Sequence, residues 1–326
     1  MAIDPKDQAR RRALVLGCLA LGAAWALPAR AAAKAGPAPA QLRIGFQKAA
    51  VNLVILKQQG ALEKRFPDSK VSWLEFPAGP QLLEALSVGA LEFGLTGDSP
   101  PVFAQAAEKD LFYVGAEPPK PQSSAILVKP DSSIRVLADL KGRKVAVQKG
   151  SSAHFLLVRA LEEARLEWSD ITAVYLPPAD ARAAFERDSV DAWAIWDPYY
   201  AAAELDARPR VLHNGVGLSG NNSFYLASRQ LVERHPATVL GLLQALTEAD
   251  AYVQGHRKES AQLVSEFSGL SLATVFRFIE RRPPSPTRPL WPSIVENQQR
   301  VADSFFRLGL IPRRIKVADI VWKPQA

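Results

Sequence analysis

The alternation of short apolar segments with amphipathic ones constrains the fold of this chain more than any other feature of its sequence. From residue 41 it reads as strand, helix, strand, helix, strand and helix over residues 41–47, 49–66, 70–77, 80–90, 91–97 and 99–110. Parallel strands need a long crossover between them, and a helix usually supplies it. The pattern therefore predicts an α/β fold with a mostly parallel sheet covered by helices on both faces.

A second series of the same kind follows the proline-rich segment 117–122. Strands are predicted at 123–130, 144–150, 171–177 and 190–196, with helices at 153–166 and 179–188. From residue 221 the pattern becomes mainly helical, and the proline-rich segment 281–292 is predicted to be irregular and on the surface. Two α/β units in one chain place the expected ligand site in the cleft between them, beyond the carboxyl ends of the strands.

Residues 1–33 have the composition of an export signal peptide. Arginines at positions 10–12 precede an apolar run, and small-residue sites follow at 29–31 and 31–33. We expect removal of this segment after export to the periplasm of a bacterium-like cell, because the apolar run is short for a membrane span. A retained membrane anchor is the less favoured alternative. The arginines leave a twin-arginine route open, and lipidation at Cys18 is the minor option.

Charge and cysteine content limit the classes of function. The net charge is +7, and loss of the first 33 residues removes five basic and two acidic residues, leaving +4. This mild charge fits a small anionic ligand and gives little support to nucleic-acid binding. Cys18 is the only cysteine, so the mature chain has no thiol chemistry, and the four histidines lack metal-ligand spacing. We expect no metal, no cofactor and no catalytic residue.

Three predicted strand ends lead directly into helix N-termini, at residues 47–48, 96–99 and 150–154. Each junction leaves backbone N–H groups unpaired, and the hydroxyls of Ser151 and Ser152 add donors. A nucleotide would require a glycine-rich loop that the chain lacks, whereas a small tetrahedral monoanion such as a sulfonate needs only a few well-placed donors. For each serine alone, helix capping is the competing interpretation.

Aromatic residues crowd the end of the last predicted strand of the second series. Four of them fall within eight residues: Trp193, Trp196, Tyr199 and Tyr200. They suit the apolar wall of a cleft that holds an organic tail, and ordinary core packing is the alternative. We expect one tryptophan to line the cleft while the other packs.

Three residues beside these segments have open roles. Asp197 either binds a cationic end of the substrate, pairs with a lysine or caps the next helix, and capping is the preferred interpretation. Asp98 has the same ambiguity. His154 either donates a ring N–H group to the ligand or has a structural role.

Several of these segments together resemble one known family. The motifs RIGFQK, FPAGPQLLEAL, TGDSPPVFAQA, YVGAEPPKP, VAVQKGSSAH, ADARAAF, VDAWAIWDPYY and SFYLA are similar to those of the periplasmic aliphatic-sulfonate-binding proteins of ABC importers. The resemblance runs from Gln41 to Pro324. It implies a two-lobed periplasmic binding protein of type II, with residues 41–122 and 223–326 in lobe 1, residues 123–222 in lobe 2 and the ligand cleft between the lobes.

The resemblance also implies which residues bind the ligand. The head group would lie among nine residues, and two tryptophans with a neighbouring aspartate would complete the pocket. Gly97, Ser151, Ser152 and His154 match the family pattern most securely. The full set is Gln47, Thr96, Gly97, Asp98, Ser123, Ser124, Ser151, Ser152, His154, Trp193, Trp196 and Asp197.

The function implied by the resemblance is capture of an alkanesulfonate in the periplasm. A monomeric receptor would deliver the ligand to an ABC transporter membrane permease with its cytoplasmic ATPase, for sulfur acquisition. Taurine, a sulfate ester or an inorganic oxyanion such as nitrate are alternative ligands, because the fold does not separate them. An enzyme on the same scaffold, with Lys48 or Lys149 as a Schiff-base amine, is the least favoured alternative.

Overall fold

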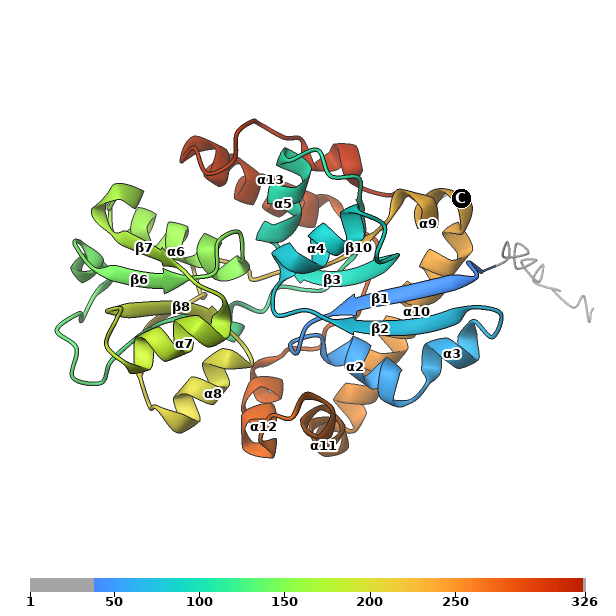
Figure 1. Cartoon of the computed structure of the whole chain (residues 1–326), viewed down its shortest axis with the longest axis horizontal. Coiled ribbons are helices and arrows are strands. Elements are labelled where there is room, and N and C mark those ends of the chain that lie inside the picture. Colours follow the sequence, from blue (N-terminus) through green and yellow to red (C-terminus); the bar gives the residue numbers. More distant parts are fainter. Residues whose placement is uncertain (1–37, 325–326) are drawn as a thin grey trace, which may run out of the picture. The chain divides into compact units, whose positions relative to one another are not determined.

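Two five-stranded sheets form the framework of the molecule (Figure 1). The computed structural model describes residues 38–324, which fall within one compact unit of the chain. The export signal predicted at residues 1–33 therefore lies outside the described residues.

The first sheet has the strand order β2-β1-β3-β10-β4. β1 pairs in parallel with β2 and β3, whereas β10 runs antiparallel to β3 and β4. Four strands therefore point the same way and one is reversed, which confirms the mostly parallel sheet. The strands are β1 (Gln41–Phe46), β2 (Lys70–Glu75), β3 (Phe93–Gly97), β4 (Phe112–Ala116) and β10 (Ser223–Ala227).

The second sheet repeats this plan with the strand order β7-β6-β8-β5-β9. β6 pairs in parallel with β7 and β8, and β5 runs antiparallel to β8 and β9. The strands are β5 (Ser124–Val128), β6 (Lys144–Val147), β7 (Thr172–Tyr175), β8 (Ala192–Trp196) and β9 (Arg210–Asn214). In both sheets the reversed strand is the one that follows a crossing of the chain from one sheet to the other.

Helices connect the parallel strands of each sheet. The first sheet has α2 (Val51–Gln58), α3 (Ala61–Arg65), α4 (Gly79–Ser87) and α5 (Ser99–Ala106) between its strands, and the second has α6 (Ser152–Glu163), α7 (Pro178–Glu186) and α8 (Tyr199–Asp206). The chain ends in α9 (Arg229–Arg234), α10 (Pro236–Gly255), α11 (Arg257–Ser268), α12 (Leu272–Arg281) and α13 (Pro292–Arg307). Short 3-10 turns are η1 (Pro121–Ser123), η2 (Leu137–Leu140), η3 (Trp168–Asp170) and η4 (Val317–Ile320).

Each sheet is packed with apolar side chains on both faces. Tyr225 and Ala227 of β10 join a cluster with α2, α10 and α11, while Phe224 and Leu226 join another with α4, α5 and α13. Successive side chains of a strand point to opposite faces, so these two clusters cover the two faces of the first sheet. In the second sheet β5 and β8 divide in the same way between a cluster with α6 and a cluster with α7.

Two predicted segments differ from the structure. The single helix predicted over residues 49–66 is divided into α2 and α3, because Gly60 takes the left-handed φ of 57° at the break. The segment 281–292 contains irregular backbone after α12, as predicted, but only part of it lies on the surface. Arg282, Ser285 and Thr287 are buried, and the Ser285 backbone N–H group donates to Asp250 at 2.9 Å.

The helices between residues 38 and 324 include none with the length and apolar character needed to cross a bilayer.

Candidate functional site

The ends of β1, β3 and β6 lead into the starts of α2, α5 and α6, as the sequence pattern predicts. Ser151 caps α6, where its Oγ accepts the His154 backbone N–H group at 3.3 Å. The first backbone N–H groups of a helix have no partner within that helix and carry its positive dipole end. These helix starts therefore provide donors that suit an anion.

A cavity lies between the two sheets beside these helix starts. Its empty volume is about 640 Å³, which includes the solvent at its mouth. Residues of both sheets and of both crossings line it. The predicted site residues that line it are Gln47, Gly97, Ser123, Ser151, Ser152, Trp196 and Asp197; the others are Ala49, Gly79, Leu95, Pro100, Lys120, Asn221, Ser223, Phe278 and Arg282.

His154 is not among the residues that line this cavity, and a ligand contact of its ring stays a prediction. Its ring is fully buried and lies near the aromatic rings of Phe103, Trp168, Tyr175 and Phe305. Nδ1 accepts the Gly150 backbone N–H group at 3.1 Å, so the ring holds the loop that precedes α6. Burial lowers the pKa of His154 to about 3, assisted by the charge of Lys149.

Trp193, Thr96 and Ser124 also lie outside the cavity lining. Successive residues of β8 alternate between its two faces, so Trp196 reaches the cavity while Trp193 packs against Phe185 with ring centroids 6.0 Å apart. Thr96 is buried, and its hydroxyl donates to the Gly97 carbonyl at 3.0 Å. The buried Ser124 hydroxyl has no hydrogen-bond partner among the described residues. All three side chains are buried outside the cavity lining.

Asp98 lies behind the cavity rather than in its lining. The Ser99 hydroxyl donates to its carboxylate at 2.9 Å. Burial raises the pKa of Asp98, while hydrogen bonds from Ser99 and Ser152 oppose this shift. Asp98 and Asn222 both line a second cavity.

Asp197 lines the cavity, but its carboxylate already has partners. Oδ1 accepts the Ala201 backbone N–H group at 3.0 Å in the first turn of α8, and it lies 3.1 Å from the Arg281 guanidinium. Asp197 thus accepts a backbone N–H group from the first turn of α8, the type of contact that the preferred interpretation predicts, although Pro198 separates it from the helix. Lysine pairing is one of the alternatives, and the cation beside Asp197 is instead Arg281 of α12.

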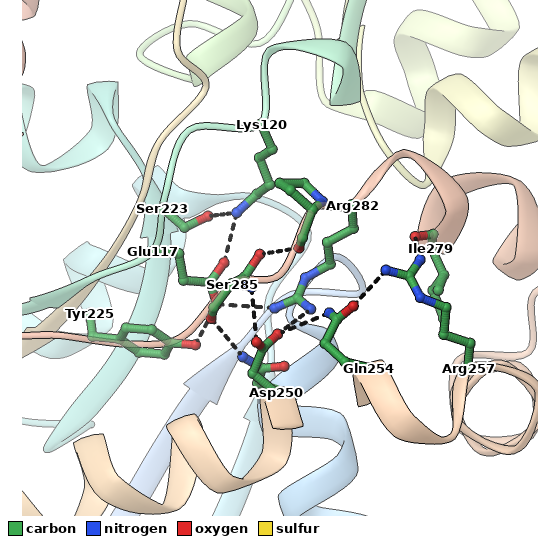
Figure 2. A network of polar contacts seen from close by, with 12 residues as sticks. Glu117, Lys120, Ser223, Tyr225, Asp250, Gln254, Arg257, Ile279, Arg282 and Ser285 are labelled. Atoms are coloured by element: carbon green, nitrogen blue, oxygen red, sulfur yellow. Dashed lines mark hydrogen bonds and ion pairs between the residues drawn. The ribbon is translucent and has the colours of Figure 1, made fainter. Parts of the chain in front are cut away.

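The sequence pattern does not identify two cations that line the cavity, Lys120 and Arg282. Lys120 belongs to the first crossing between the sheets, and Arg282 follows α12 at the start of the proline-rich segment. Figure 2 shows both beside Glu117, which accepts a hydrogen bond from Lys120 Nζ at 2.8 Å. The signal for them in the sequence is a charged residue next to prolines, which is also typical of an exposed turn.

Between residues 38 and 324 no group of three or more histidine, cysteine, aspartate or glutamate side chains has the arrangement of a metal site. The cavity instead combines hydroxyl, amide and cationic donors with an apolar wall that includes Leu95, Pro100, Trp196 and Phe278. Such a cavity suits an anionic head group attached to an organic tail.

Two α/β lobes with a ligand cavity between them define the class of the two-lobed periplasmic binding proteins. Comparison with known sequences identifies the family: the chain belongs to the NMT1-like family, and the match spans residues 35–268.

Two solved structures are similar to the whole of this fold. The periplasmic aliphatic sulphonate binding protein SsuA from Escherichia coli has 49% sequence identity and a TM-score of 0.82, covering 88% of this chain and 94% of that one. The alkanesulfonate-binding protein SsuA from Xanthomonas axonopodis pv. citri, bound to MOPS, has 49% identity and a TM-score of 0.84, covering 87% and 98%. A taurine-binding periplasmic protein of Escherichia coli is 26% identical over 220 residues, which are 63% of this chain and 68% of that protein.

Proposed function

We propose that this chain is a binding protein that captures aliphatic sulfonates and delivers them to an ABC import permease for sulfur acquisition. The observation that carries this proposal is the composition of the cavity, where helix starts and hydroxyl groups face an apolar wall. A sulfonate has one negative charge, three acceptor oxygens and no proton, so it suits a site made of hydrogen-bond donors. Its alkyl tail matches Trp196 and Phe278.

The chain is a binding protein and not an enzyme, in agreement with the relatives, which are named as binding proteins. The two lysines considered for Schiff-base chemistry are outside the cavity lining. Lys48 Nζ donates to the Ser268 carbonyl at 2.9 Å, and Lys149 Nζ lies 5.5 Å from the centre of the Tyr175 ring.

The partners of Asp197 favour an uncharged tail over the ammonium group of taurine. A carboxylate attracts an ammonium group strongly only where no other cation neutralises it. Arg281 lies 3.1 Å from this carboxylate and is itself largely buried. Taurine therefore ranks below simple alkanesulfonates among the ligands that we propose.

The lobe boundaries belong to this proposal. We assign residues 41–122 and 223–326 to lobe 1 and residues 123–222 to lobe 2, supported by the two crossings between β4 and β5 and between β9 and β10. We further propose a monomer in the periplasm, made by removal of residues 1–33, with a membrane permease and its cytoplasmic ATPase as partners. The periplasmic location of the relatives supports this assignment.

Thermal unfolding tests the ligand class. A ligand that binds the folded state raises the melting temperature. We expect ethanesulfonate and butanesulfonate to raise the Tm of the protein purified without residues 1–33, and taurine to raise it less. The buffer must be free of sulfonates, so Tris is suitable. No shift with any of these compounds contradicts the proposal, and a strong preference for taurine reverses the ranking of ligands.

A further inference from the structure

Figure 2 shows a buried network that includes four charged residues. Lys120 and Arg282 line the cavity, and Glu117 and Asp250 pair with them from behind. Lys120 Nζ lies 2.8 Å from Glu117 Oε2, and Arg282 Nη1 lies 2.9 Å from Asp250 Oδ1. A weaker contact of 3.6 Å joins Arg282 to Glu117, so all four charges belong to one network.

Neutral donors hold the two carboxylates in place. The Tyr225 hydroxyl donates to Glu117 Oε1 at 2.8 Å, and the Ser285 backbone N–H group donates to Asp250 Oδ2 at 2.9 Å. Burial alone would raise the pKa of Glu117, but the charges of Lys120 and Arg282 lower it overall. Glu117 is therefore a carboxylate at neutral pH, and it cancels one of the two cations.

Lys120 is the member of the network that a ligand can reach. Its ammonium group has three N–H donors, and it donates to Glu117 and, at 2.6 Å, to the Ser223 hydroxyl. Its side chain keeps 13% exposure beside the cavity, whereas Glu117 keeps 4%. The network thus offers the ligand a cationic donor without offering it a surplus positive charge.

We propose that Lys120 and Arg282 contact the anionic head group and that Glu117 sets the preference of the cavity for singly over doubly charged anions. This inference rests on the proposed function and concerns the same site. The Coulomb energy between a ligand and a fixed charge grows with the ligand's own charge. A surplus cation would therefore favour sulfate over a sulfonate, and Glu117 removes that surplus.

The other charged groups around the cavity add no surplus cation. Arg281 lies 2.7 Å from Glu204 Oε2 and 3.1 Å from Asp197 Oδ1, so Glu204 neutralises its charge even when Asp197 carries a proton. Asp98 is buried behind the helix start of α5. The net charge of the cavity wall therefore depends on whether Lys120 and Arg282 are neutralised by their carboxylate partners.

The test measures binding of sulfate and ethanesulfonate by titration calorimetry in Tris, for the wild type and for Glu117→Gln. Glutamine keeps the size and an acceptor oxygen but leaves Lys120 without a countercharge. We expect the ratio of the sulfate Kd to the ethanesulfonate Kd to fall by roughly tenfold or more. Glu248→Gln is the matched control, since Glu248 is an exposed carboxylate of α10 near Asp250, and its ratio should equal that of the wild type.

Lys120→Gln provides a second test with the opposite sign. It leaves an uncompensated carboxylate, so we expect weaker ethanesulfonate binding and a ratio that rises by roughly tenfold or more. If Glu117→Gln does not fold, the Kd ratio of Lys120→Gln alone tests the inference. Unchanged ratios in folded variants overturn the inference while the proposed function stands. Failure of the wild type to bind ethanesulfonate contradicts the proposed function itself.

Discussion

At the scale of single residues, the two lobes approach each other closely at Gly97. A Cβ atom at this position would lie 1.9 Å from Ser152 Oγ, a distance that no real pair of such atoms adopts. Gly97 ends β3 of the first sheet, and Ser152 begins α6 beside the second. The absence of a side chain at Gly97 therefore allows the two walls of the cavity to meet.

We expect Gly97→Ala to weaken ethanesulfonate binding by about tenfold or more, because the added methyl group displaces Ser152, a buried contact of this kind being worth about 1 to 3 kcal/mol. Titration calorimetry measures the affinity, and circular dichroism checks the fold. Gly255→Ala is the control, since a Cβ there meets no atom within 4 Å. Wild-type affinity in a folded Gly97→Ala protein would contradict this prediction, because it would show that the lobes accommodate the added methyl group.

His154 gives a second prediction at this scale. Its folded pKa of about 3 lies below the ordinary value of 6.5, so its contribution to stability is present above about pH 6.5 and is lost as the pH falls toward 3. His154→Gln keeps an acceptor for the Gly150 N–H group but has no titratable ring. We expect it to lose less unfolding free energy than the wild type between about pH 7 and pH 5.

The affinity of the same variant for ethanesulfonate, measured at neutral pH, separates packing from ligand contact. Because the ring does not line the cavity, the affinity should stay within about threefold of the wild type, a difference of less than about 1 kcal/mol. A much larger loss would return His154 to the set of ligand-binding residues.

At the scale of elements, α12 and α8 connect the two lobes through charged side chains. Arg281 of α12 lies 3.1 Å from Asp197 Oδ1 and 2.7 Å from Glu204 Oε2, and its guanidinium lies 3.9 Å from the centre of the Tyr200 ring. Arg277, one turn earlier, lies 3.2 Å from Glu204. α12 follows β10 of the first sheet, whereas α8 follows β8 of the second, so these contacts hold the lobes together on one side of the cleft.

This bridge gives stability a pH dependence through Asp197. Burial raises its pKa from 3.8 to about 7, although Arg281 opposes the shift. The folded protein then holds a proton that the unfolded chain has already lost, so this contribution is fully present below about pH 4 and is lost as the pH rises through 7. We expect the wild type to lose up to about 3 kcal/mol more unfolding free energy between pH 5 and pH 8 than Asp197→Asn.

Chemical denaturation at the two pH values measures this difference. Asp206→Asn is the matched control, because Asp206 is an exposed carboxylate at the end of the same helix and pairs with Arg182 at 2.8 Å. It should keep the pH dependence of the wild type. Equal pH dependence in Asp197→Asn and the wild type would mean that Asp197 stays ionised through its pair with Arg281.

At the scale of the whole molecule, the two crossings between the sheets lie side by side and are hydrogen-bonded to each other. The Glu117 N–H group donates to the Ser223 carbonyl at 3.0 Å, and the Lys120 N–H group donates to the Gly220 carbonyl at 2.9 Å. Lys120 also lines the cavity, so the ligand site and the connection between the lobes share a residue. A ligand that contacts Lys120 acts directly on the segment where the lobes join.

Much of this architecture follows from local sequence patterns. Alternating strands and helices predict two α/β units. The helix starts after β3 and β6 predict where hydrogen-bond donors lie. Both patterns can be recognised because they depend on residues that are close together in the chain. The sequence pattern does not predict β4, β9 or β10; β9, for example, is short and has polar and charged residues at both ends. The burial of Ser285 was also missed, because proline-rich segments are usually exposed and its partner Asp250 lies in another helix.

The sequence by itself determined the two-unit α/β fold, the helix starts that offer donors, and the aromatic segment that supplies Trp196. Only the tertiary structure decided that Trp193 and His154 pack outside the cavity and that Lys120 and Arg282 line it. The physical reason is the range of the interactions. Strand alternation and helix capping act over a few residues, whereas the pairing of Arg282 with Asp250, and of Arg281 with Asp197, joins residues that are distant in the chain.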